Sequence, residues 1–267
     1  MIRQTEQVSD TRKEFKFMSS SIISQVFRGI LVGIFAGVVV GSFRFLIEKS
    51  FHLVQAAYVK GRSEWLWLVA LLFLYAFIVF INARLVRTER DIKGSGIPQI
   101  EAELKGLMSL SWWGILWKKF LVGTLAISSG LMLGREGPSI QLGAMSGKGI
   151  SKWLKLSPLE ERALIASGAA AGLAAAFNAP IAGLLFVVEE VYHHFSRVFW
   201  VSTLAASLVA NFISLSMFGL TPVLDMPDNI PFMGLEQYWI YILMGLFLGL
   251  SGFLYEKAVL NIHLVYE

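Results

Sequence analysis

Five consecutive residues, Gly134-Arg135-Glu136-Gly137-Pro138, place two charges, two glycines and a proline between two apolar runs. Proline suits the first turn of a helix, where its missing N–H would have no partner anyway, and glycine lets the backbone come close to a ligand. The pattern predicts an exposed helix N-terminus, whose free amides and positive dipole end favour an anion. Glu136 lies where its own carboxylate competes with a dissolved anion. The alternative interpretation is a cytosolic loop with one salt bridge.

A second stretch, Lys93-Gly94-Ser95-Gly96-Ile97-Pro98-Gln99, repeats this pattern before a short helical segment at Gln99–Leu104. A serine hydroxyl beside a helix N-terminus can donate to an anion, and the glycines give access to the backbone. The stretch has neither the phosphate-loop pattern nor the dinucleotide fingerprint. Taken alone, it also fits a turn followed by a proline at the first helical position.

Two adjacent acids, Glu189 and Glu190, end an expected helix at Ile181–Tyr192. The helix dipole disfavours negative charge at a C-terminus, so the presence of two acids at this end requires an explanation. Either they reach cytoplasmic water, pair with Arg197 or cap a neighbouring helix, or one of them loads protons. The residue types alone leave both interpretations open.

The composition is that of an integral membrane protein. Hydrophobic residues make up 55% of the chain, charged residues 16%, and the mean hydropathy is +0.63. Soluble proteins average roughly 45–50% apolar and about 25% charged residues. Short or interrupted apolar segments, Gly29–Phe43 and Phe120–Gly134, accompany longer ones, which is typical of transporters whose helices stop within the membrane. The uncharged runs long enough to span are Trp65–Ala83, Ala163–Val188, Val198–Leu224 and Gln237–Tyr255.

Several function classes are disfavoured by what the chain contains. It has no cysteine, and its four histidines have no metal-ligand spacing, so we expect no metal site. No nucleophile and base are arranged for catalysis, so we expect neither an enzyme nor a cofactor. The formal charge of +4 comes from basic residues near membrane segments, which topology explains better than nucleic acid does. The positive-inside rule places residues 1–20 in the cytoplasm, and they do not resemble a cleaved signal peptide.

Three further patterns predict how the helices are built. Gly29, Gly33, Gly37 and Gly41 recur every four residues and predict one face that packs closely on another helix. Ser157-Pro158-Leu159-Glu160 predicts a capping box with proline at the first helical position. Phe177-Asn178-Ala179-Pro180 predicts a helix break.

Three stretches occur in a fixed order: Gly94–Pro98, Gly134–Pro138, and Gly168–Pro180 running into Glu189-Glu190. In this the chain resembles the CLC family of chloride channels and proton-coupled chloride antiporters, from about Ile22 onward. The resemblance implies an all-α polytopic membrane protein with broken and tilted helices, built from two inverted repeats. It places a membrane domain at 21–267, with the first repeat at about 21–220 and the start of the second at about 236–267. We therefore expect a chain truncated after the first helix of the second repeat.

The resemblance also implies roles for individual residues. Glu136 takes the position of the glutamate that gates anions and transfers protons, and Glu190 that of the internal proton-transfer glutamate. Ser95 takes the position of the serine that contacts the central anion and, being serine rather than proline, favours chloride over nitrate. Backbone at further positions faces the anion path: Gly96, Ile97, Gly134, Arg135 and Gly137.

The function implied is voltage-independent chloride transport with a glutamate gate, in the form of chloride/proton antiport. The alternatives are a CLC channel without proton coupling, since Glu190 alone separates the two, and a fragment that does not transport, since the second-repeat motif and a late anion-contacting tyrosine have no counterpart. The partners implied are chloride, protons, membrane lipid and, for a full-length protein, a second copy. We expect a bacterial-type inner membrane and a cytoplasmic N-terminus.

Overall fold

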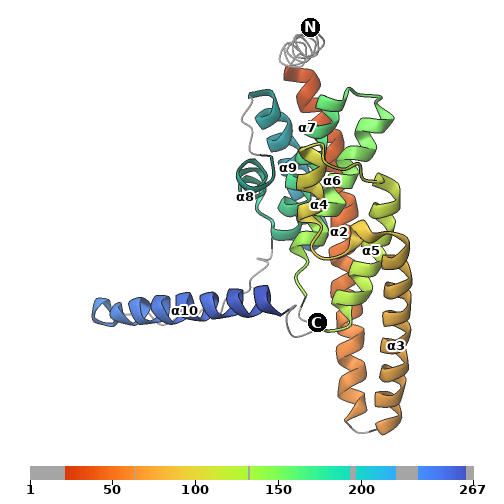
Figure 1. The fold of residues 1–267 in the computed structure, drawn as a ribbon, viewed down its shortest axis with the longest axis vertical. Coiled ribbons are helices and arrows are strands. Elements are labelled where there is room, and N and C mark those ends of the chain that lie inside the picture. Colours follow the sequence, from red (N-terminus) through yellow and green to blue (C-terminus); the bar gives the residue numbers. More distant parts are fainter. Residues whose placement is uncertain (1–21, 63, 132, 193–196, 221–233, 263–267) are drawn as a thin grey trace. The chain divides into compact units, whose positions relative to one another are not determined.

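The computed structural model describes residues 22–62, 64–131, 133–192, 197–220 and 234–262, and these contain helices and no strand (Figure 1). The expected cytoplasmic segment 1–20 lies outside the described residues. The α-helices are α2 (Ile22–Gly61), α3 (Trp65–Thr88), α4 (Ile97–Leu104), α5 (Trp112–Ser128), α6 (Glu136–Trp153), α7 (Pro158–Phe177), α8 (Pro180–Phe186), α9 (Arg197–Phe218) and α10 (Trp239–Asn261). The shorter elements are the 3₁₀ turns η1 (Arg90–Ile92) and η3 (Leu235–Gln237) and the π-helical turn η2 (Val187–Tyr192).

The chain forms two compact units, Met1–Val223 and Leu224–Glu267. The three motifs Gly94–Pro98, Gly134–Pro138 and Gly168–Pro180 belong to the first unit. In the second, α10 is apolar up to Tyr255 and its large side chains are exposed. The repeat boundaries expected from the family resemblance stay a prediction.

The glycine face of α2 packs on α9, as the spacing predicts. A Cβ on Gly33 would lie 2.5 Å from the backbone oxygen of Ala206, and one on Gly37 would lie 2.9 Å from the Cα of Ala210. Gly29 meets α9 backbone in the same way, one helical turn earlier. The prediction of a close small-residue seam is therefore confirmed.

A second seam joins α6 to α7 and forms the centre of the first unit. Gly143 and Gly168 bring the two backbones so close that a Cβ on either would overlap the other's carbonyl oxygen. Around them the alanines of α7 are fully buried, Ala169, Ala170 and Ala171 among them. Small side chains thus let α6, whose first residue is Glu136, lie deep inside the unit.

Within the described residues, four helices are long and apolar enough to cross a membrane. They are Ile22–Gly61, Trp65–Thr88, Phe199–Phe218 and Leu235–Asn261. Much of α3 is exposed, with Leu72, Phe73 and Phe80 each about 70% accessible. Apolar surface of this extent is unfavourable in water and favourable in hydrocarbon, as expected for an integral membrane protein.

The structure extends or divides three of the expected segments. The first helix, expected to end near Glu48, continues to Gly61 because neither glycine nor proline occurs between them. The apolar run Ala163–Val188 is divided where Asn178 adopts φ 56° and Pro180 starts α8, so the predicted break is confirmed. The helix expected at Ile181–Tyr192 is α-helical only to Phe186 and continues as the π-turn η2, which carries Glu189 and Glu190.

Candidate functional site

Ser95 lies immediately before α4, in a turn that glycine makes possible. Gly96 is the N-cap residue and has φ 93°, a left-handed conformation that costs glycine little and other residues more. The amide of Ile97 donates to the hydroxyl oxygen of Ser95 (3.3 Å). The serine oxygen is thereby held beside the N-terminus of α4.

Glu136 is the first residue of α6, as its place before Pro138 predicts. Ser139 fixes this end of the helix, because its hydroxyl donates to the carbonyl of Arg135 (2.7 Å). The carboxylate of Glu136 turns back over Gly134, where a Cβ would collide with it. The glutamate side chain therefore lies across the start of its own helix.

The two predicted motifs meet although they are about forty residues apart in the chain. A Cβ on Gly137 would lie 2.6 Å from the Cβ of Ser95 and 2.7 Å from its backbone oxygen. Real Cβ contacts do not become this short, so Gly137 is the residue that allows the start of α6 to rest on the Ser95 turn. The serine and the glutamate are thus brought to the same place.

A cavity of about 530 Å³ lies at this junction. The residues that line it include Ser95, Glu136 and Lys119, together with Gly134 and Gly137. A small anion placed here would meet a hydroxyl donor, a cation and backbone at the start of a helix, which are the groups that favour negative charge.

Lys119 is a site residue that the sequence reasoning missed. The residue is buried, and its ammonium group donates to the carbonyls of Ile92 (2.9 Å) and Gly94 (2.7 Å), in the turn that leads to Ser95. In the sequence the pair Lys118-Lys119 follows Trp117 and is typical of a membrane interface, which gives no reason to place either lysine in the site. A lysine inside an otherwise apolar helix is the signal that was available, but it does not tell which of two adjacent lysines turns inward.

Arg135 does not line this cavity, and its side chain joins the turn before α6 to α2. Its guanidinium donates to Glu48 (3.2 Å), which also accepts from Arg44 (2.9 Å). Two of the six positions expected to face an anion, Arg135 and Gly96, do not line this cavity. They do not line the second cavity either, which is described next. Gly96 instead lies against the side chain of Gln141.

A second cavity, of about 860 Å³, lies on the other side of Glu136. Apolar side chains from α6, α7 and α8 form most of its wall, and Ile97 contributes from α4. Its charged lining consists of three carboxylates, those of Glu136, Glu189 and Glu190. Both acids of η2 are exposed and have no ion-pair partner among the described residues. Glu136 therefore lines both cavities, one with Ser95 and one with Glu190.

A buried ion pair holds α4 and α6 together behind the site. Lys148 of α6 donates to Glu103 of α4 and to the carbonyl of Leu110 (2.6 Å), and both charged side chains are almost fully buried. The pair fixes the position of α4, which begins at Ile97, relative to α6, which begins at Glu136. No sequence pattern indicated this pairing.

The described residues contain no group of three or more acidic or histidine side chains arranged to hold a metal ion. What they do contain is the carboxylate-bearing residue Glu136, which lines both a cavity with Ser95 and Lys119 and a cavity with Glu189 and Glu190.

Comparison with known proteins identifies the family. Residues 77–267 match the model of the voltage gated chloride channel family. A relative in Vibrio vulnificus, named H⁺/Cl⁻ exchange transporter ClcA, is 35% identical over 264 residues, covering 94% of this chain and 54% of the relative. The protein of the same name in Vibrio cholerae is 36% identical over 269 residues, with the same two coverages. The chain thus spans about half the length of the curated relatives it matches.

Solved structures agree in fold. A slow cyanobacterial Cl⁻/H⁺ antiporter superposes with a TM-score of 0.79 at 30% identity, covering 89% of this chain and 57% of the antiporter. A CLC-type fluoride/proton antiporter superposes with a TM-score of 0.65 at 21% identity, covering 86% of this chain and 55% of its own. The second likeness is one of fold alone.

Proposed function

The chain belongs to the CLC family, and from this premise we propose that it supplies the anion gate and the proton path of a chloride/proton antiporter. The observation that carries the proposal is the place of Glu136, which lines both a cavity with Ser95 and Lys119 and a cavity with Glu190. A carboxylate in that place can couple the two ions. The names of the relatives, H⁺/Cl⁻ exchange transporter and Cl⁻/H⁺ antiporter, support the same function.

In the anion step, the ionised carboxylate of Glu136 occupies the position that chloride would take. Protonation removes its charge, so that it no longer competes with chloride for the amides of Gly134–Gly137 and the hydroxyl of Ser95. The ammonium of Lys119 adds a positive potential in a cavity of low dielectric. Chloride is held by these donors, with no catalytic residue and no cofactor.

In the proton step, Glu190 receives a proton from water at the exposed surface of η2 and passes it to Glu136 through the second cavity. The apolar walls of that cavity disfavour a bare ion, so water between the carboxylates carries the proton. Protonated Glu136 no longer occupies the anion position. Each proton that reaches Glu136 therefore allows a chloride ion to bind there.

The proposal also covers the membrane, the orientation of the chain and its contact with a second copy. We place the N-terminus in the cytoplasm and the protein in a bacterial-type inner membrane. We also propose that full-length copies form a homodimer through α8, η2 and α9. Apolar side chains on α8 and α9 are exposed and available for such a contact, including Ile181, Leu185 and Phe212. Lipid covers the remaining apolar surface.

The test is ion flux in proteoliposomes, prepared with the 267-residue chain and with the product of the whole reading frame that contains it. An inward chloride gradient should drive protons outward against their own gradient. Replacing Glu136 by Gln should abolish proton movement while chloride still flows. Chloride flux in the unsubstituted protein without any proton movement would instead mean a channel.

The adjacent acid gives a matched control for the proton path. Glu189 and Glu190 lie on the same turn, line the same cavity and have the same charge. We expect Glu190→Gln to lose proton coupling and Glu189→Gln to retain it. Equal loss in both variants would show that the charge of η2, rather than a proton relay at Glu190, is what transport needs.

A further inference from the structure

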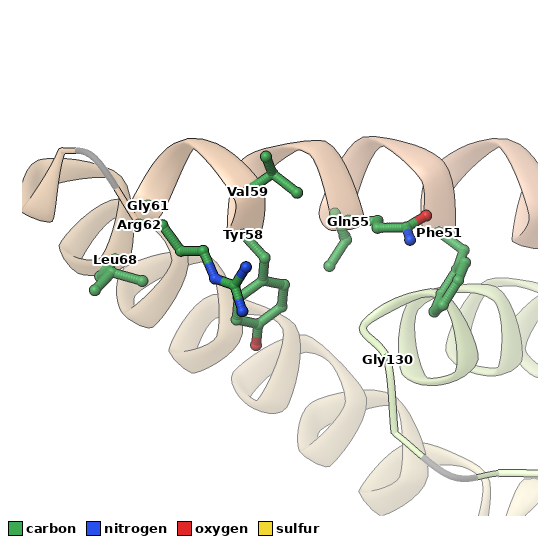
Figure 2. Close-up of a pocket in the computed structure, with 9 residues that line it drawn as sticks. Phe51, Gln55, Tyr58, Val59, Gly61, Arg62, Leu68 and Gly130 are labelled. Atoms are coloured by element: carbon green, nitrogen blue, oxygen red, sulfur yellow. The ribbon is translucent and has the colours of Figure 1, made fainter.

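A groove that the transport proposal does not use lies between the end of α2 and the start of α3 (Figure 2). Its volume is about 610 Å³, and its lining is mostly apolar. Phe51, Val54 and Tyr58 recur at helical spacing on one face of α2, while Leu68 closes the groove from α3. Figure 2 shows Phe51, Tyr58 and Arg62 projecting toward the same space.

Hydrogen bonds make one wall of the groove rigid. The hydroxyl of Tyr75 in α3 donates to the carbonyl of Ser129 (2.8 Å) and lies 3.0 Å from the hydroxyl of Tyr58. The rings of the two tyrosines are in contact, with centroids 6.5 Å apart. These bonds link α2, α3 and the end of α5, so the groove is a built surface rather than a gap between loose helices.

The depth of the groove in a membrane follows from the helices that form it. Both α2 and α3 are long and apolar enough to span, and the exposed indoles of Trp65 and Trp67 mark the interface at the start of α3. From Phe51 to Arg62 the groove follows about three turns of helix, or about 16 Å. One leaflet of hydrocarbon is about 15 Å thick. The groove therefore has the length of one acyl chain, with Arg62 at the level of the headgroups.

The charge at the rim favours an anion. Arg62 lines the groove, is exposed and has no ion-pair partner among the described residues. The nearby carboxylate of Glu64 accepts from the indole of Trp67 (3.2 Å), and the ammonium of Lys60 lies 5.2 Å from the centre of the same ring. Two cations and one anion leave this turn with a net positive charge.

We propose that this groove binds one membrane phospholipid with an anionic headgroup, its acyl chain lying along Phe51, Val54 and Tyr58 and its phosphate paired with Arg62. The guanidinium offers a planar pair of donors that matches phosphate oxygens. An anionic headgroup is favoured over a zwitterionic one because the choline ammonium would lie beside Lys60 and Arg62. Gly130, at the start of the loop that leads to Glu136, forms the far end of the groove, so the lipid lies against that loop.

The test is photocrosslinking in phosphatidylcholine vesicles that contain a small fraction of phosphatidylglycerol with a photoactivatable group on its acyl chain. Mass spectrometry of the peptides should place the label on residues 51–62. Because one basic residue contributes a factor of about five to anionic lipid binding, Arg62→Gln should reduce this label about fivefold, while Arg62→Lys retains most of it. A photoactivatable phosphatidylcholine should label the same peptide weakly and equally in all three proteins.

Two variants separate the groove from general attraction to the surface. Arg87→Gln removes an exposed arginine at the other end of α3 and should leave the label on 51–62 unchanged. Val54→Trp fills the groove and should reduce the label from both lipids. The proposal is overturned if Arg62→Gln is labelled as strongly as the unsubstituted protein, or if the label is spread along α3 with no preference for residues 51–62.

Discussion

Lys119 illustrates how one buried side chain serves structure and chemistry together. Its ammonium group satisfies two carbonyls of the turn before Ser95 and also lines the cavity assigned to chloride. Lys118, the preceding residue, is partly buried and is paired with Glu89 at the end of α3 (3.2 Å). The two lysines differ in environment and not in type, which makes them a matched pair.

Replacing Lys119 by Met should lower the free energy of unfolding by about 1–3 kcal/mol, because the buried carbonyl of Ile92 and the partly buried carbonyl of Gly94 lose a charged donor. It should also weaken chloride binding, since the cavity loses its cation. Lys118→Met should cost less than Lys119→Met, because the Lys118 ion pair is only partly buried and water can reach the Glu89 that is left behind. Thermal unfolding in detergent with and without chloride measures both effects; equal losses in the two variants would contradict the assignment of Lys119 to the site.

The capping box of α7 is a second residue-scale feature. The hydroxyl and amide of Ser157 both donate to Glu160 (2.7 and 3.0 Å), and Arg28 of α2 donates to its other oxygen (2.6 Å). Burial by itself would raise the pKa of Glu160, but the bonds from Ser157 and the charge of Arg28 outweigh it and lower that pKa below the usual 4.5. Glu160 begins α7 and lies outside the four spanning helices.

A lowered pKa means that the folded protein holds the carboxylate more tightly in its charged form than the unfolded chain does. Its contribution to stability is therefore complete above pH 4.5 and is lost as the pH falls through the lower folded value. Glu160→Gln keeps a capping side chain but removes the charge, and should destabilise the protein by about 1–3 kcal/mol at neutral pH. The difference from the unsubstituted protein should shrink below pH 4.5. A difference that stays constant with pH would exclude the charge as its cause.

At the scale of helices, the fold depends on two glycine seams, α2 with α9 and α6 with α7. Side chains fill most helix contacts, whereas here backbone approaches backbone. The absence of Cβ atoms at Gly143 and Gly168 sets how deep α6 lies, and hence where Glu136 meets Ser95. The position of the site is thus a consequence of residues that never contact an ion.

Gly168→Ala should therefore destabilise the protein by at least about 1–3 kcal/mol, because the added methyl group meets the carbonyl of Gly143 and no side-chain rotation can relieve the overlap. It should also reduce transport by moving α6. Gly245→Ala in α10 is the control: nothing lies within 4 Å of its Cβ position, and alanine favours helix by about 1 kcal/mol. Unfolding temperatures of the two variants that fall by equal amounts would contradict this account.

At the scale of the whole molecule, the orientation in the membrane follows from the basic residues at the two ends of α3. Arg84, Arg87, Arg90 and Lys93 gather at its C-terminal end, whereas the turn before its start holds Lys60 and Arg62. The larger number of basic residues predicts that the C-terminal end of α3 faces the cytoplasm.

The chain has no cysteine, so single cysteines report orientation without background labelling. A maleimide that does not cross membranes, added to intact cells, should label Glu64→Cys and not Arg90→Cys. Opening the membrane should make both accessible. The reverse pattern would place the N-terminus outside and overturn the proposed direction of the proton path.

Much of this protein is determined by its sequence alone. Composition indicates a membrane protein, and the glycine–proline stretches indicate helix starts shortly after Ser95 and at Glu136, because caps and breaks depend on a few neighbouring residues. The seam of Gly29 to Gly41, the capping box at Ser157 and the break at Asn178 were predicted for the same reason, and the order of the motifs indicated the family. The length of α2 was not predicted correctly. The helix was expected to end near Glu48, but no local signal marks an end there.

Only the tertiary structure decided which distant residues meet. Lys119 turns inward while Lys118 does not, Lys148 pairs with Glu103, Arg135 turns to Glu48, and Gly137 rests on Ser95. Each of these contacts joins residues far apart in the chain, and its partner is chosen by how helices pack on small residues rather than by any nearby sequence. The junction of two cavities at Glu136 is the sum of such contacts, and that is why it could be located only in the folded protein.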